Sequence, residues 1–181
     1  MGAVAVQIVS PTAADLDSLL DEFVHVEAAN WKGRHGTALA VDSLRGRFFR
    51  RYAAYACRAG TLRLCVLRIA GRPAAAQFAI ESGNRFWLLK IGYDERFASC
   101  SPGVLLIAET VKYAASRGLH SYEFLGVAAP WTRPWTRQEH PCVSIRAYHA
   151  RPSGLATLAA DVAHAGGEKL RHVLRGRDVG D

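Results

Sequence analysis

The order of the secondary-structure signals constrains this chain most. Strand patterns at 61–69, 74–81 and 85–93 are separated by short turn sequences, which indicates an antiparallel meander. A helix signal and a further strand pattern at 121–125 follow. Because a strand–helix–strand unit forms a crossover, the strands at 85–93 and 121–125 should lie parallel. The combination predicts an α+β fold with a mixed, mostly antiparallel sheet, one parallel crossover and helices on both faces.

The crossover helix has the clearest boundaries. Ser101 is a favourable N-cap residue, Pro102 suits the first helical position, and Gly118 suits the position after the helix. The apolar stripe of this helix is expected at Val104, Leu105, Ala108, Val111 and Ala115. Residues 153–175 are also expected to be helical, with a break near Gly166 and Gly167.

The N-terminal part predicts a strand and a capped helix. Residues 3–9 form an apolar strand pattern. Thr12 and Asp15 have the spacing of a capping box, in which each side chain bonds a free amide of the first turn. The helix behind them should reach about Ala29, and residues 30–40 should form a loop.

A second helix is expected from Asp42 to the residues before Gly60. Its buried stripe is predicted at Leu44, Phe48, Tyr52 and Tyr55, and its outward face at Arg45, Arg47, Arg50 and Arg51. That basic face fits either a solvated surface or an anion site. After the Trp- and Pro-rich segment 130–141, residues 143–149 read as another strand.

Composition indicates one compact globular domain over residues 1–181. The excess of 23 Lys and Arg over 16 Asp and Glu gives a net charge of +7, which favours nucleic acid, an anionic membrane or a phosphate-rich cofactor as partner. The cysteines are widely and irregularly spaced: Cys57, Cys65, Cys100 and Cys142. This spacing argues against a metal site and fits a reduced compartment. We therefore expect a soluble, cytoplasmic protein without a metal.

Several short motifs carry a family resemblance. They are Trp31-Lys32-Gly33, Gly36-Thr37-Ala38-Leu39, Phe48-Phe49, Lys90-x-x-Tyr93-Asp94-Glu95, Ser101-Pro102-Gly103 and Phe124-Leu125-Gly126. In this order and spacing the chain resembles GCN5-related N-acetyltransferases (GNAT), in the branch of CelD/BcsL-type acyltransferases, also described as the BioF-associated acetyltransferase-like domain and related to the Fem peptidyltransferases. The resemblance covers about residues 10–148, so residues 153–175 would be a C-terminal helical extension.

The resemblance implies an acyl donor, acetyl-CoA or another acyl-CoA, between two parallel strands that splay apart. Here these strands would be 86–93 and 122–125, with the donor's pyrophosphate at the start of the following helix. The helix dipole and free amides favour an anion there. The cofactor-binding residues would then be Ser101, Gly103, Val104 and Leu105, although Ser-Pro-Gly is also simply a good helix start.

Three residues are candidates for the chemistry. Lys90 would be an orienting or anion-binding cation, and Asp94 (or its neighbour Glu95) a general base, if both project from one face of their strand. The alternative is a surface pair at a strand end. Glu123 would either face the site as a partly buried carboxylate, or point to solvent or pair with an arginine.

The acceptor side of the resemblance is less complete. Trp31, Lys32 and Trp131 would bind the acceptor substrate. Ala128 and Ala129 stand where the family carries acidic residues, and Thr132 stands where it carries a lysine. Relatives pair two such domains, so a homodimer or a partner domain would complete the arrangement.

Three functions remain open from the sequence. The first is an acyltransferase that moves an acetyl or acyl group from acyl-CoA, or an acyl carrier protein, to an amine or hydroxyl of a saccharide or cell-envelope precursor. The second is a Fem-like transferase that uses aminoacyl-tRNA, which the charge of +7 permits. The third is a non-catalytic binding or scaffold module, for which the altered loop at 128–132 argues.

Overall fold

A computed structural model describes most of the chain. The described residues are 2–29, 43–126, 129–141, 143 and 145–175, with the backbone alone for Ser43 and for 165–175. The chain divides into two compact units, Met1–Trp135 and Thr136–Asp181. The expected loop at 30–40 lies outside the described residues. None of the described helices combines the length and hydropathy that crossing a bilayer requires.

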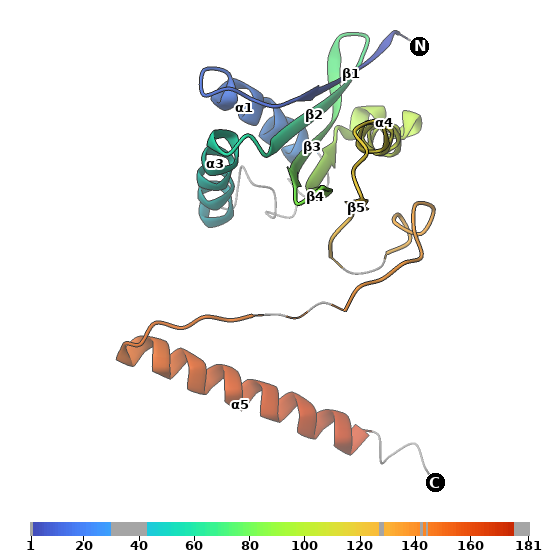
Figure 1. Ribbon diagram of the computed structural model, residues 1–181. Helices are drawn as coiled ribbons and strands as arrows, with labels where there is room; N and C mark the ends of the chain where they lie inside the picture. Colours follow the sequence, from blue (N-terminus) through green and yellow to red (C-terminus); the bar gives the residue numbers. More distant parts are fainter. Residues whose placement is uncertain (1, 30–42, 127–128, 142, 144, 176–181) are drawn as a thin grey trace. The chain divides into compact units, whose positions relative to one another are not determined.

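The first unit is built on a five-stranded sheet (Figure 1). Its strands are β1 (Val4–Val9), β2 (Leu62–Ile69), β3 (Arg72–Ser82), β4 (Arg85–Tyr93) and β5 (Ser121–Glu123), in the order β1-β2-β3-β4-β5. The first three pairings are antiparallel and β4 with β5 is parallel. The predicted mixed sheet and its single parallel crossover are confirmed.

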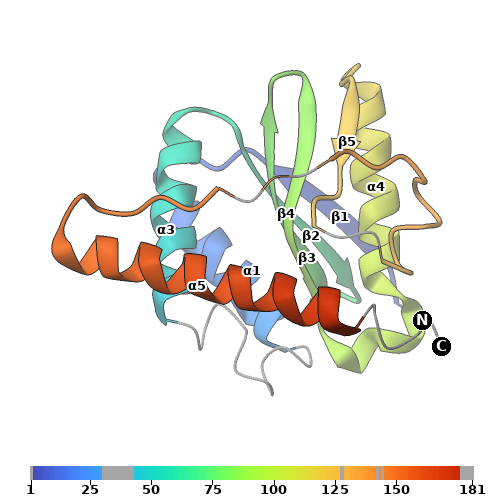
Figure 2. The ribbon, with the colours of Figure 1, turned by 90° about the horizontal axis from the view of Figure 1, so that it is seen from below.

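Helices cover both faces of this sheet (Figures 1 and 2). The helical elements of the unit are α1 (Leu16–Ala28), α3 (Ser43–Arg58), the short 3-10 helix η1 (Glu95–Cys100) and α4 (Pro102–Ser116). The pair α1 and α3 packs on one face, with Phe23, Phe49 and Tyr52 around the buried ring of Phe78. On the opposite face, Leu106 and Ala114 of α4 pack with Phe86 in a second core.

The buried faces of two helices differ from the sequence prediction. In α3, Leu44, Phe48 and Tyr55 are exposed, and Ala53 and Ala56 are buried against the sheet beside Tyr52. Both sides of this helix carry apolar residues, so the spacing of the large apolar residues predicted the wrong buried side. The small alanines are the side that lets the helix approach the sheet closely. The four arginines do face outward.

In α4 the predicted stripe is displaced along the sequence. Val104, Leu105 and Ala115 are exposed, whereas the buried side consists of Pro102, Leu106, Ile107, Thr110 and Ala114. Thr110 is tolerated there because its hydroxyl donates to the carbonyl oxygens of its own preceding turn. Because Thr110 is polar, a search for apolar residues at helical spacing did not recognise the buried side of α4.

Two further elements were predicted wrongly. The described residues of 143–149 form no strand, and Val143 and Ile145 are exposed, because alternation of side chains gives no sheet without a partner strand. The helix α5 (Pro152–Arg175) runs through Gly166 and Gly167 without a break, since glycine inside a helix costs only about 1 kcal/mol.

The capping box before α1 forms only by half. The carboxylate of Asp15 accepts a hydrogen bond from the Thr12 amide at 2.5 Å. The Thr12 hydroxyl donates to that same carboxylate at 2.8 Å instead of accepting a bond from the helix. One of the two reciprocal bonds of the motif is therefore missing.

Candidate functional site

The strands β4 and β5 part after a short pairing. Their register contains only Arg85 with Ser121, Phe86 with Tyr122, and Trp87 with Glu123. Beyond this point β4 continues to Tyr93 with no partner strand on that side among the described residues. A register shift against β3, between Phe78 and Ala79, lies at the same level. Backbone amides and carbonyls of an edge strand are available to a ligand, so an extended ligand arm has partners here.

The start of α4 lies beside the unpaired part of β4. A Cβ atom placed on Gly103 would be 3.7 Å from Tyr93 Cδ1 and 3.8 Å from Ile91 Cδ1. Ser101 occupies the N-cap position with the left-handed backbone of φ 48°, and its side chain caps no amide. Such a backbone is unfavourable for a residue other than glycine, so η1 and α4 together hold Ser101 in place.

The amides of this first turn are mostly used within the chain. Val104 and Leu105 both donate to the Ser101 carbonyl, at 3.0 and 3.2 Å. The expectation that their amides are free for an anion is therefore wrong, because the N-cap carbonyl already accepts them. The Gly103 amide makes no hydrogen bond within the described residues, and Pro102 has no N–H to donate. Val104 and Leu105 instead present exposed apolar side chains.

Asp94 is engaged as the N-cap of η1. Its carboxylate accepts from the Arg96 amide at 3.0 Å and from the Arg96 guanidinium, with Nη2 at 2.5 Å. The Arg96 hydrogen bonds hold the pKa of Asp94 below its ordinary value, against the opposing effect of burial. Asp94 is therefore an ionised group with both oxygens occupied. That arrangement fits a positioning role better than a general base.

Lys90 lies on the face of β4 that α1 and α3 cover. Its Nζ is 5.4 Å from the centre of the Phe49 ring of α3, a cation–π distance. Gly92 is next on the same face, and a Cβ atom there would approach Glu27 Cα of α1 to 2.6 Å. Among the described contacts none joins Lys90 to Asp94. The predicted cation and carboxylate therefore form no described hydrogen bond or ion pair with each other.

Glu123 occupies the last paired position before the strands part. Its side chain is 13% exposed and accepts hydrogen bonds from Arg85 Nη1 at 2.9 Å and Ser121 Oγ at 2.7 Å. The interpretation that Glu123 pairs with an arginine is confirmed. Its register partner Trp87 packs against the core under α1 and α3, so Glu123 and Lys90 lie on the same face of the sheet.

The aromatic segment after β5 forms a ring cluster. Phe124 contacts the Trp131 ring at 6.0 Å and the Trp135 ring at 6.4 Å between centroids. Trp131 stays 46% exposed. Thr132 is buried, and its hydroxyl accepts from the Ala129 amide and donates to the Ala129 carbonyl. Thr132 thus closes the turn that presents Trp131, a role that sequence reasoning missed although threonine is a common turn former.

Some expectations fall outside the described residues. Trp31, Lys32 and Ala128 lie there. Within the described part of the chain, no group of three or more His, Cys, Asp or Glu side chains has the arrangement of a metal site.

Comparisons with known proteins identify the fold. The structure is similar to an aminoglycoside acetyltransferase, HMB0005, from an uncultured soil metagenomic sample, with a TM-score of 0.58, 11% identity and coverage of 80% of this chain and 99% of that one. It is also similar to a GCN5-related N-acetyltransferase from Ralstonia eutropha (TM-score 0.53, 16% identity, 79% and 99% coverage). A third similar structure is AAC(6')-Iy in complex with the bisubstrate analog CoA-S-monomethyl-acetylneamine (TM-score 0.54, 12% identity, 82% and 100% coverage).

At these identities the solved structures establish the fold alone. No curated protein sequence matches the chain. The sequence model described as "Acetyltransferase (GNAT) domain" matches residues 1–133. Because this match covers most of the 181 residues, the chain belongs to the GNAT acetyltransferase family, whose members take the acetyl group from acetyl-CoA.

Proposed function

We propose that this protein transfers an acetyl or longer acyl group from acyl-CoA to the amine of a small, saccharide-like acceptor, as a member of the CelD/BcsL-type branch. The observation that carries the proposal is the parting of β4 and β5 after three residue pairs, directly beside the start of α4. An extended arm with amide groups finds unpaired strand backbone there, and its phosphates find a helix N-terminus.

The donor would be held by residues at the start of α4. The free Gly103 amide would bind phosphate oxygens, as would the Ser101 hydroxyl, which makes no capping hydrogen bond to the helix. The exposed side chains of Val104 and Leu105 would cover the apolar part of the donor arm, in place of the amide role that the sequence suggested. The net charge of +7 favours a donor that carries several phosphates.

The chemistry would take place on the other face of the sheet. The donor supplies a thioester, in which the acceptor nitrogen displaces sulfur as the new C–N bond forms and the C–S bond breaks. Glu123 would take the proton from the acceptor amine, held in place by Arg85 and Ser121. Lys90 would stabilise the negative charge that develops on the carbonyl oxygen. Asp94 would position η1, and through it the start of α4.

The acceptor would lie against the aromatic cluster. Trp131 is 46% exposed and packs against the Phe124 ring in a T-shaped arrangement, and an aromatic face held in this way suits the apolar face of a sugar ring. Trp31 and Lys32 are proposed to complete this acceptor pocket. Two proteins of the same fold act on or bind aminoglycoside-type amines according to their names, which supports an amine on a saccharide as the acceptor class.

Thermal unfolding with candidate ligands tests the proposal. Acetyl-CoA at a hundred times its Kd should stabilise the protein by about 2.7 kcal/mol, and an amino sugar or aminoglycoside should then release free CoA thiol. Stabilisation by tRNA alone would favour the Fem-like alternative. An absence of any shift with either ligand would favour a non-catalytic module and contradict the proposal.

A further inference from the structure

Gln77 is a buried polar residue whose side-chain amide has no hydrogen bond of normal geometry among the described residues. It lies in the middle of β3 and is fully buried, yet neither Nε2 nor Oε1 makes a hydrogen bond. Gln77 does interact with the Tyr122 hydroxyl, whose pKa it lowers slightly against the larger effect of burial, but this contact falls outside normal hydrogen-bond geometry. Leaving a buried amide unsatisfied costs about 1–3 kcal/mol, and native proteins rarely tolerate it. The neighbours of Gln77 on the same face of β3, Ala75 and Ala79, are buried and apolar.

Gln77 lies close to the region where β4 and β5 separate. In the sheet register it lies between Cys65 of β2 and Ile91 of β4. Cys65 packs in the core under α4, and Ile91 Cδ1 lies 3.8 Å from the Cβ position of Gly103. Gln77 therefore faces α4 and is one strand away from the stretch of β4 that β5 leaves unpaired.

A second polar group from the other parting strand reaches the same place. The Tyr122 hydroxyl of β5 is held by the Thr110 hydroxyl of α4 at 3.0 Å. Burial raises the pKa of Tyr122, so this phenol stays protonated and acts as a neutral hydrogen-bonding group. Together Gln77 of β3 and Tyr122 of β5 offer hydrogen-bond donors and acceptors on the face of the sheet that α4 covers, one from each side of β4.

We infer that Gln77 recognises an amide group in the arm of the acyl donor. A carboxamide side chain complements a secondary amide in both directions, because Nε2 donates to its carbonyl and Oε1 accepts from its N–H. The pantetheine arm of CoA carries two such amides. The inference rests on the proposed function. It predicts that Gln77 contributes to binding of the complete donor, which has the amide arm, and not to binding of the donor's nucleotide part alone.

The substitution Gln77→Met tests this assignment, because methionine keeps the length of the side chain and removes both polar atoms. Titration calorimetry should show that acetyl-CoA binds roughly tenfold more weakly, the loss expected for one buried hydrogen bond. Binding of 3′-phosphoadenosine 5′-diphosphate, the nucleotide half of CoA without an amide arm, should not change. The free protein should melt at the same temperature or higher, since two unsatisfied atoms disappear.

Two further variants sharpen the result. Gln7→Met makes the same change on the exposed edge strand β1 and should leave both affinities unaltered. Gln77→Asn keeps the amide but withdraws it by one methylene, so it should weaken acetyl-CoA binding selectively and serves if Gln77→Met does not fold.

The outcomes separate this inference from the function on which it rests. Unchanged acetyl-CoA affinity in both Gln77 variants would overturn it and leave Gln77 to an ordered water molecule. An equal loss for acetyl-CoA and the nucleotide would also overturn it, because Gln77 would then act through the fold. A wild-type protein that binds neither ligand would overturn the proposed function itself.

Discussion

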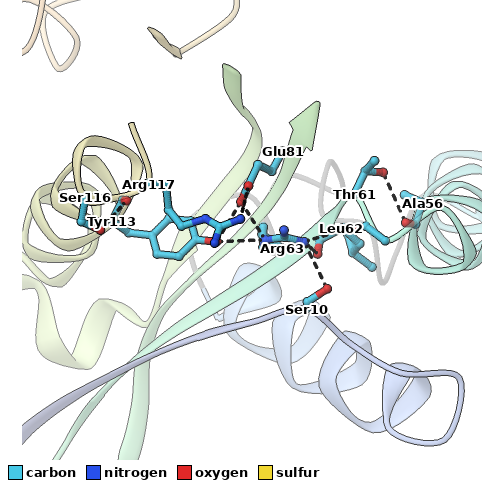
Figure 3. Close-up of polar contacts among 10 residues, drawn as sticks. Ser10, Ala56, Thr61, Leu62, Arg63, Glu81, Tyr113, Ser116 and Arg117 are labelled. Atoms are coloured by element: carbon cyan, nitrogen blue, oxygen red, sulfur yellow. Dashed lines mark hydrogen bonds and ion pairs between the residues drawn. The ribbon is translucent and has the colours of Figure 1, made fainter. Parts of the chain in front are cut away.

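Glu81 is the centre of a polar network between β3 and α4 (Figure 3). Its side chain, 11% exposed, accepts from Arg63 Nε at 3.0 Å, from the Tyr113 hydroxyl at 2.8 Å and from Arg117 at 3.1 Å. Burial alone would raise the pKa of Glu81. The hydrogen bonds of Tyr113 and Arg117 and the charge of Arg63 outweigh burial, so the pKa lies below its ordinary value.

The substitution Glu81→Gln should lower the free energy of unfolding by about 1–3 kcal/mol at pH 7, because Arg63 loses its buried counter-charge. A depressed folded-state pKa stabilises the protein above the unfolded-state value of about 4.3, and this stabilisation is lost as the pH falls through the folded-state pKa. Urea unfolding should therefore show the difference between variant and wild type shrinking below about pH 4.

A suitable control for this measurement is Glu109→Gln. Glu109 pairs with Lys112 on the exposed side of α4, and exposed pairs of this kind contribute less than about 1 kcal/mol. A Glu81→Gln effect that is equally large at pH 3 and pH 7 would contradict the charge-based explanation.

Asp94 offers a test between two roles for one carboxylate. In Asp94→Asn the side-chain oxygen can still accept from the Arg96 amide, so a positioning residue should lose less than about tenfold in kcat. Removing a general base typically costs about 100-fold to 10,000-fold. Steady-state kinetics over pH 5–9 decide between them, and a loss of the acidic limb together with a large fall in kcat would contradict the positioning role.

The elements that were predicted best are those with a turn or capping signal in the sequence at both ends. The limits of β4, Arg85 and Tyr93, agree with the prediction because a turn precedes the strand and Asp94 follows it. Gly118 ends α4 with a φ of 67°, as expected of a residue in the left-handed region. Helix faces were predicted poorly, because burial of Ala53 or Thr110 depends on the partner surface rather than on the helix sequence.

The candidate site shows the same division. Local capping signals predicted that α4 begins directly after Ser101, whereas it was the family resemblance that placed Ser101 and Gly103 beside the strand 86–93. The sequence did not indicate that the Asp94 carboxylate is bound by Arg96, or that the Gln77 amide is buried without a hydrogen bond of normal geometry. Those facts arise from side-chain geometry and from a neighbouring strand, neither of which leaves a periodic signal.

Alanine substitutions of the two glycines at the ends of α4 should have opposite effects on stability and on acetyl-CoA binding. Gly103→Ala finds only ordinary contacts of 3.7 and 3.8 Å and adds helix propensity of about 0.5–1 kcal/mol, so the free protein should be as stable or more stable. Its methyl group should nevertheless hinder close approach of the donor phosphates, and the acetyl-CoA Kd should rise severalfold.

Gly118→Ala should do the reverse. Its φ of 67° makes any side chain strained although space is open, so it should cost about 1 kcal/mol of stability and leave the acetyl-CoA Kd unchanged. Thermal melting with and without acetyl-CoA measures both quantities. Equal behaviour of the two variants would contradict a phosphate site at the start of α4.

The two units of the chain are stabilised by different kinds of contact. Both hydrophobic cores consist of residues from Met1–Trp135. The unit Thr136–Asp181 is held by polar contacts around Asp161, which accepts from the Tyr148 hydroxyl and pairs with Arg146 at 2.7 Å. Because both cores are contained in the first unit, its stability should not depend on the second.

A chain of residues 1–135 tests this expectation against the sequence interpretation of one domain over 1–181. Because the shortened chain keeps the sheet and both cores, it should unfold in one cooperative transition, with a Tm within about 5 °C of the full chain, which corresponds to about 1 kcal/mol for a domain of this size. It should also keep its acetyl-CoA shift, since Gln77, Gly103 and Tyr122 remain. Circular dichroism and calorimetry would report both. A broad, non-cooperative transition, or a fall in Tm well beyond that range, would show instead that residues 136–181 belong to the same folding unit.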